Sequence, residues 1–160
     1  MTSDLTRAAM ALVPNELRAA RRFAVQFLYQ LDSSQQMFLS DGLLDAFCKQ
    51  NEVPEAQRHF IKTVIEVCFA QKQEIDSLIE ASAVNWKLSR IARVDLAILR
   101  ICTAELMTRS EVAKDVIIFE GIEIGKEFGS TASGSFINGV LDRIARNTQA
   151  KGQDELDAGR

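Results

Sequence analysis

The feature that most constrains the fold is helical periodicity, because apolar residues recur at three- and four-residue steps along most of the chain. In the stretch from Leu88 to Leu106 they cover almost every face, as in a helix that other helices surround. The chain has only 2 prolines and no alternating Thr/Val-rich stretch, which argues against strands. We therefore predict an all-α protein with this stretch as its central helix.

The other helices are predicted from the same spacing together with residues that favour helix ends. Pro14 suits the first turn of a helix, Ser40 or Asp41 can cap the next one, and Gly129 suits the position after a last turn. The predicted ranges are 14–32, 41–51, 54–84 with a break near Ala70, 112–128 with Ser110 as N-cap, and 133–147 with Ser133 as N-cap.

Residues that could carry catalysis or hold a metal are few and scattered. Cys48, Cys68 and Cys102 each lie in a stretch of helical apolar spacing, which is typical of reduced core cysteines. His59 is the only histidine and cannot complete a zinc site without further ligands. No phosphate-binding glycine motif is present. We predict a binding protein without catalytic residues, metal or cofactor.

The predicted location is the cytoplasm. The sequence has no run of about 18 apolar residues that would suit a membrane-spanning helix. The segment 1–13 lacks the continuous apolar stretch of a secretory signal. Unpaired cysteines also fit a reducing compartment.

A basic strip on the first long helix is the strongest candidate for a binding surface. At about 100° per residue, Arg18, Arg22, Val25 and Tyr29 fall within roughly 60° of one another, with Arg21 just beside them. Guanidinium groups neutralise phosphates and an aromatic ring can stack on an unpaired base, so the spacing suits single-stranded RNA. The formal net charge of −3 requires such a local patch. The alternative is an ordinary solvated basic face.

A second candidate surface is the turn before the last helix. Phe128 and Phe136 flank a run of glycine, serine and threonine residues there. Hydroxyl and backbone N–H groups at a helix start can bind phosphate. Both rings could equally belong to the core.

Four segments together resemble the NusB family. They are LRICTAEL from Leu99, DVIIFEGIEIGKEFG from Asp115, SFINGVLDRIAR from Ser135 and RRFAVQFLYQLD from Arg21. Their order and spacing cover most of residues 18–146.

The resemblance implies about seven helices in two roughly perpendicular helical bundles. The corresponding domain spans 14–149, with one bundle at about 14–84 and the other at about 88–149. We expect residues 1–13 to form a flexible extension and the polar segment 150–160 to be a disordered tail.

The resemblance also implies a function in transcription antitermination. NusB proteins pair with the ribosomal protein NusE, bind the boxA element of nascent RNA and help RNA polymerase read through terminators, notably in ribosomal RNA operons. The family's protein-partner position for NusE corresponds to Asp95. The RNA-binding positions correspond to Arg18, Arg21, Arg22, Tyr29, Phe128 and Phe136.

The sequence departs from the family pattern at three positions near these sites. Ala132 replaces an acidic residue, Ser135 replaces a lysine or similar polar residue, and Phe119 replaces an asparagine. One alternative is therefore a diverged NusB-like module with little RNA affinity, which self-associates as a homodimer or binds a protein through an apolar face near Phe119. Another is the RNA-binding part of an RNA-modifying enzyme, since NusB-like domains also occur fused to RNA cytosine methyltransferases.

Overall fold

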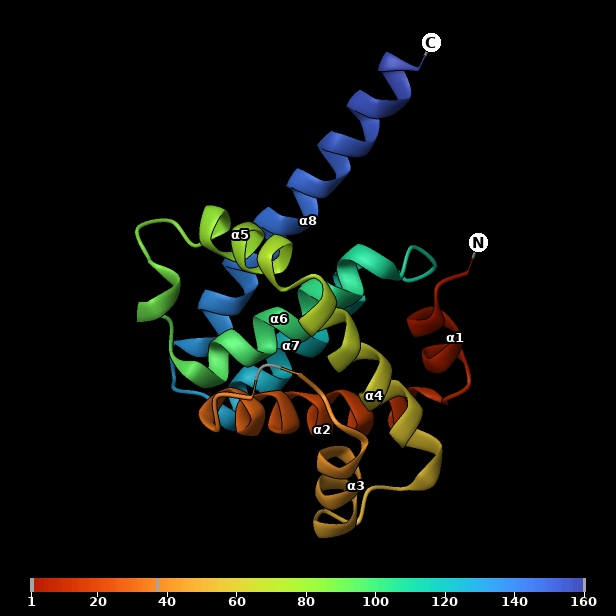
Figure 1. The fold of residues 1–160 in the computed structure, drawn as a ribbon. Coiled ribbons are helices and arrows are strands. Elements are labelled where there is room, and N and C mark those ends of the chain that lie inside the picture. The colour runs from red at the N-terminus through yellow and green to blue at the C-terminus, as the bar shows by residue number, and fades with distance from the viewer. Residues whose placement is uncertain (1, 37, 160) are drawn as a thin grey trace.

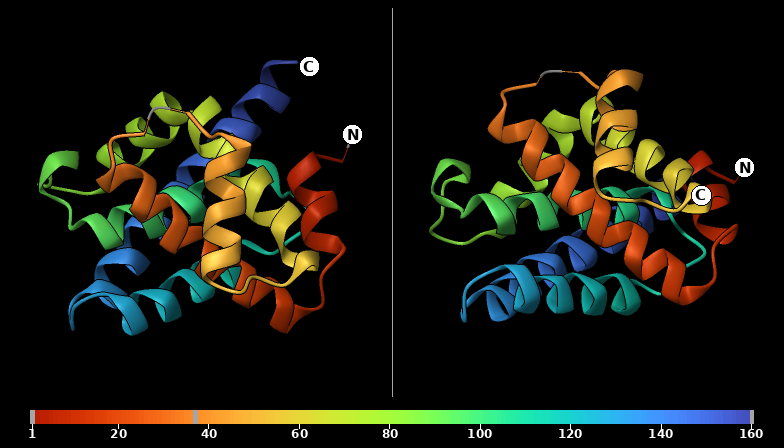
Figure 2. Two further views of the ribbon diagram at one scale, coloured as in Figure 1. Left: turned by 60° about the horizontal axis from the view of Figure 1, so that its bottom comes forward. Right: turned by 90° about the horizontal axis from the view of Figure 1, so that it is seen from below.

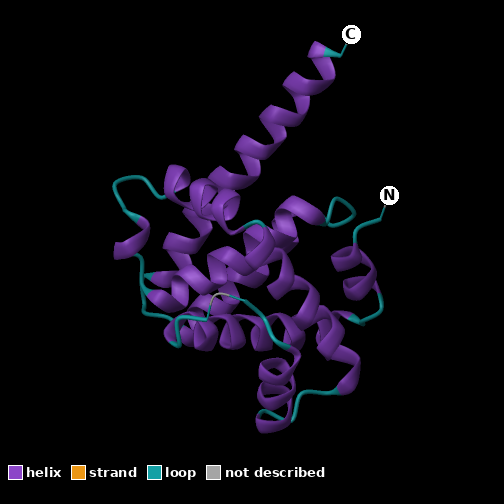
Figure 3. Ribbon diagram, viewed as in Figure 1, coloured by secondary structure: helices purple, strands orange, loops and turns teal. Residues whose placement is uncertain are grey.

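The structure, a computed structural model, describes residues 2–36 and 38–159, and over that range it consists of helices joined by loops, without strands (Figures 1 and 3). The predicted all-α class is confirmed. No helix in this range is both long and apolar enough to cross a membrane. The elements are α1 (Asp4–Met10), α2 (Pro14–Ser33), α3 (Asp41–Gln50), α4 (Glu55–Ala70), α5 (Lys72–Ser82), the 3-10 helix η1 (Leu88–Arg90), α6 (Arg93–Thr108), α7 (Lys114–Phe128) and α8 (Ser133–Ala158).

The helices form two groups that meet at α6 (Figure 2). In the first group α4 packs on α1 and α2, and α3 joins them through Phe47, whose ring stacks on Phe27 at 4.7 Å. In the second group α6, α7 and α8 pack on one another. Helix α6 also packs on α2 and α4, and its Ile98, Leu99 and Ile101 are completely buried. The helix predicted to be central is therefore at the centre of the core, but it begins only at Arg93, because Leu88–Arg90 form the separate helix η1.

The predicted long helix at 54–84 is two helices, which separate at Gln71, next to the predicted break. After this break α5 packs mainly on α6 and α8. Residues 72–82 therefore belong with the second group, whereas the sequence prediction placed them in the first. A change of chain direction between two adjacent amphipathic segments is not visible in their periodicity.

Only one of the three predicted serine caps is confirmed. The Ser40 hydroxyl accepts a hydrogen bond from the Leu43 amide at the start of α3. Ser110 caps nothing, because α7 begins only at Lys114. Ser133 lies inside α8, and its hydroxyl accepts a hydrogen bond from the Ser130 amide at 2.9 Å.

The prediction of a flexible extension at 1–13 is wrong for α1, which is docked on α4 and α6. Leu5 is only 1% exposed. The hydroxyl of Ser3 donates to the Thr108 carbonyl at 2.8 Å, and that of Thr6 donates to Glu111 at 2.9 Å. Two long-range hydrogen bonds and a buried leucine hold the helix in place. Met1 lies outside the described residues.

The last helix also continues past its predicted end at 147. It runs to Ala158, and its final turns extend away from the other helices (Figure 1). The segment predicted to be disordered contains alanine, glutamine, lysine and glutamate, which have high helix propensity. Propensity and the preceding helix therefore explain the extension. Arg160, at the end of the predicted tail, lies outside the described residues.

Docking of α1 makes a testable contribution to stability. We expect Leu5→Ala to lower the free energy of unfolding by about 2–5 kcal/mol, because it leaves a cavity against α4 and α6. Met10→Ala on the same helix is the control and should change it by less than about 0.5 kcal/mol, since Met10 is 70% exposed. Urea denaturation measures both. Equal stability of the two variants would mean that α1 is undocked.

Candidate nucleic-acid and protein interface

Three of the predicted RNA-binding residues lie on one flank of α2, although Val25, which the sequence placed on the same flank, is only 2% exposed. The opposite side of α2 carries Ala24 and Leu28, which are buried against α4 and α6. This burial leaves Arg18, Arg22 and Tyr29 facing outward, with 51% and 40% of the two arginine side chains exposed and Tyr29 40% exposed. We call these three residues the α2 strip.

Arg21, by contrast, is not on this surface, so its predicted contact with RNA is wrong. Its side chain is 3% exposed. Its Nε and Nη2 donate to the two carboxylate oxygens of Glu105 on α6, at 2.6 and 2.8 Å. The guanidinium is paired with a buried carboxylate, where no phosphate can reach it.

The Arg21–Glu105 pair is part of a larger buried ion network. Glu105 also accepts a hydrogen bond from Arg109 at 2.7 Å, and Arg109 donates to Glu111 at 2.9 Å. Burial alone would raise the pKa of Glu105, but the charges and hydrogen bonds of Arg21, followed by those of Arg109, outweigh it and lower that pKa below its ordinary 4.5. The network holds α2, α6 and the segment after α6 together.

Helix α7 brings carboxylates and an aromatic ring to the α2 strip. Arg18 donates from Nε and Nη2 to Glu120 at 2.9 and 2.8 Å, and Arg22 forms an ion pair with Glu127. The guanidinium carbon of Arg22 lies 5.8 Å from the centre of the Phe128 ring. The fold therefore places Phe128, 36% exposed, beside the strip, although the sequence assigned it to a separate surface; that it contacts RNA stays a prediction.

A separate cleft of about 240 Å³ contains the other two predicted site residues, Asp95 and Phe136. It is also lined by Trp86, whose ring meets that of Phe136 edge to face at 6.4 Å. Asp95 is 7% exposed, and its Oδ1 has no hydrogen-bond partner among the described residues. That oxygen is buried, so the case for a ligand rests on Asp95 lining the cleft: a carboxylate beside two aromatic rings suits a ligand group that carries N–H donors.

Sequence reasoning missed Trp86, which lies between α5 and η1. The ring is 49% exposed although tryptophan is usually well buried. The available signal was the chain's single tryptophan next to an expected junction between helices. The sequence also assigned Phe136 to RNA and Asp95 to NusE, whereas the structure places both in one cleft.

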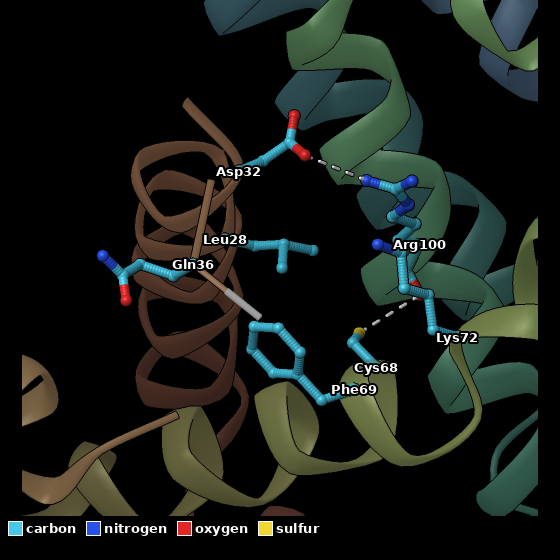
Figure 4. A pocket seen from close by; sticks show the side chains of 7 residues that line it. All are labelled: Leu28, Asp32, Gln36, Cys68, Phe69, Lys72 and Arg100. Atoms are coloured by element: carbon cyan, nitrogen blue, oxygen red, sulfur yellow. Dashed lines mark hydrogen bonds and ion pairs between the residues drawn. The ribbon is translucent and has the colours of Figure 1, made fainter. Parts of the chain in front are cut away.

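The cysteines and the histidine lack the surroundings of catalytic groups. Figure 4 shows a small cavity of about 30 Å³ where α2, α4 and α6 meet. There the thiol of Cys68 donates to the Arg100 carbonyl at 3.7 Å, and burial raises the pKa of Cys68 to about 12. Cys48 and Cys102 are also buried, and His59 is exposed on α4. The described residues contain no cluster of three potential metal ligands.

These features define a class: an all-helical binding protein with exposed arginines and aromatic rings on one surface and a carboxylate-containing cleft on another. Residues 18–146 match the NusB family. The chain is 39% identical to the transcription antitermination protein NusB of Geobacter sulfurreducens, over 84% of this chain and 97% of that protein. The chain therefore belongs to the NusB family.

Solved structures agree with this assignment. T. maritima NusB superimposes with a TM-score of 0.70 at 30% identity, over 81% of this chain and 89% of that one. A complex of the antitermination factors NusB and NusE with double-stranded RNA gives a TM-score of 0.74 at 21% identity, over 84% and 99% of the two chains. At 21% sequence identity, the second match shows only that the two chains share a fold.

The buried ion network makes Arg21 a stability residue. We expect Arg21→Gln to lower the free energy of unfolding by about 3–5 kcal/mol, because Glu105 loses its bidentate partner inside the core. The control Arg22→Gln breaks a pair in which both side chains are about 40% exposed and should cost less than about 1 kcal/mol. Urea denaturation at pH 7 distinguishes the two, and equal losses would contradict the buried role of Arg21.

The same pair predicts acid sensitivity. Because the pKa of Glu105 is lowered on folding, its stabilising contribution is complete above about pH 4.5 and is lost as the pH falls through the folded-state pKa. Below that pH, the free energy of unfolding of the Arg21→Gln variant should therefore fall less steeply than that of the wild type. An unchanged acid profile would mean that other carboxylates determine it.

Proposed function

We propose that this chain is a transcription antitermination factor that binds boxA-type RNA together with NusE and promotes read-through by RNA polymerase, notably in ribosomal RNA operons. The proposal rests on membership of the NusB family. One structural observation supports it most directly. Arg18, Arg22 and Tyr29 share an exposed flank of α2, and Phe128 of α7 lies beside Arg22.

This surface combines two modes of RNA contact. Arginines bind phosphate oxygens with geometry that suits their forked donors, whereas aromatic rings stack on bases without reading much sequence. The solved NusB–NusE complex contains double-stranded RNA. For this chain we favour single strands, because exposed rings can stack only on bases that are not already paired.

The cleft with Asp95 is the proposed contact with NusE. A protein partner that inserts an N–H donor, such as an arginine or lysine side chain, would pair with the Asp95 carboxylate where it lines the cleft. The aromatic rings of Trp86 and Phe136 would cover the apolar part of that side chain.

The proposed action is binding without catalysis. Burial keeps the Cys68 thiol protonated at neutral pH, since its pKa is about 12. We place the protein in the cytoplasm, where transcription and ribosome assembly occur in bacteria.

The α2 strip is tested by titrating single-stranded boxA RNA over a series of salt concentrations. Arg22→Gln should reduce the slope of log K against log salt by about 0.7, because one phosphate contact is lost. Tyr29→Ala should weaken binding by about five- to a hundredfold with the slope unchanged, because it removes stacking. The two variants thus separate the two contacts.

Lys62→Gln is the control, since it removes a cation on α4 that pairs with Asp41 outside the strip. It should bind RNA as the wild type does. If all four proteins bind equally, the strip is not the RNA surface. If none binds and the wild type dimerises, the diverged self-associating module replaces the antitermination factor, with Phe119 and Val116, about half exposed on α7, as its apolar contact.

The cleft is tested by Asp95→Asn in a pull-down with purified NusE. We expect affinity to fall by about ten- to a hundredfold, because a buried charge-assisted hydrogen bond is lost. Asp115→Asn is the matched control, since Asp115 is also a first-turn carboxylate, exposed on α7 and outside the cleft. Both variants lose similar helix-dipole stabilisation. Equal NusE affinity for the two would remove Asp95 from the interface.

A further inference from the structure

The surface between α2 and α7 is electrically balanced. A groove of about 360 Å³ separates the two helices and is lined by three cations and three carboxylates. These are Arg18, Arg22, Lys126, Glu120, Glu123 and Glu127. The two positive charges of the α2 strip are therefore balanced by carboxylates of α7 in the free protein, and the usual electrostatic attraction for phosphate is cancelled locally.

Glu120 holds its arginine firmly. The carboxylate is only 11% exposed, and it binds Arg18 through both Nε and Nη2. It also lies 3.9 Å from the buried Arg21. Because Glu120 is mostly buried and lies near two arginines, its carboxylate stays paired with Arg18 and orients that guanidinium.

Glu127 is placed differently. It lies near the end of α7, with 42% of its side chain exposed, and it meets Arg22 through a single nitrogen, Nη2. Exposed single ion pairs contribute little stability because water solvates the separated charges well. This pair can therefore open at small cost, and the guanidinium of Arg22 remains next to Phe128.

We infer that Glu127 is an affinity-determining residue, an intramolecular carboxylate that competes with RNA phosphate for Arg22. In the free protein it occupies the guanidinium, and a phosphate must displace it to bind beside Phe128. RNA affinity is thereby set below what the exposed arginine alone would give. The inference rests on the proposed RNA-binding function of the α2 strip.

The test compares Glu127→Gln with Glu123→Gln by titration with single-stranded boxA RNA at one fixed, low salt concentration. Each variant removes one negative charge from α7, but Glu123 pairs with Lys126 at 3.2 Å and contacts neither arginine of the strip. Glu127→Gln should bind RNA about two- to fivefold more tightly than Glu123→Gln, the range that an exposed ion pair can contribute. Equal affinity of the two variants would overturn the competition.

A double variant distinguishes the possible failures. If Glu127 acts through Arg22, the gain disappears in the Arg22→Gln background, where Glu127→Gln should bind no more tightly than Arg22→Gln alone. A gain that persists there would be a general charge effect and would overturn the inference. If Arg22→Gln weakens binding but Glu127→Gln changes nothing, only the competition fails. If neither Arg22→Gln nor Tyr29→Ala affects RNA binding, the proposed RNA surface itself fails.

Discussion

The ion pair between Arg21 and Glu105 is the interaction on which the rest of this structure depends. It joins α2 to the central helix α6 through two hydrogen bonds, with both side chains almost completely buried. A bidentate pair tolerates little rotation of either helix, because both guanidinium nitrogens must face one carboxylate. Fixing Arg21 inward therefore fixes the rotation of α2 and turns Arg18, Arg22 and Tyr29 outward. A buried residue thus determines which residues form the surface.

The fold was largely predictable from apolar spacing because most helices bury a continuous stripe. The exceptions have physical causes. Helix α1 has seven residues, too few to be stable alone, and forms through contacts with residues about a hundred positions away, such as Thr108 and Glu111. The end of α8 has no apolar stripe, so its helical state reflects propensity and the helix that precedes it. The end of α8 therefore leaves no periodic signal in the sequence. Helix α1 does leave a short one, since Leu5, Ala8, Ala9 and Leu12 recur at helical spacing and are all buried, and the sequence prediction overlooked it.

The candidate site was predictable only in part, as Arg21 illustrates. Arg21 and Leu28 are seven residues apart and differ by only about 20° around the helix, so the position of Leu28 on the apolar side already indicated burial. What the sequence could not reveal is the partner that makes burial of an arginine acceptable, since Glu105 lies 84 positions away. The cleft containing Trp86, Asp95 and Phe136 was hidden for the same reason, because three separate segments build it.

Charge balance explains how an acidic protein can present arginines for RNA without binding it indiscriminately. The formal net charge is −3, and Arg18, Arg21 and Arg22 each have a carboxylate partner within the chain. Long-range attraction to any nucleic acid is therefore small, and binding depends on short-range contacts: stacking on Tyr29 or Phe128 and exchange of a carboxylate for a phosphate. Such contacts require the RNA to be held close. A protein partner that also binds RNA supplies this proximity by raising the local RNA concentration at the strip. Under the proposed function, the carboxylates that occupy these arginines would make RNA binding at the strip depend on assembly with such a partner.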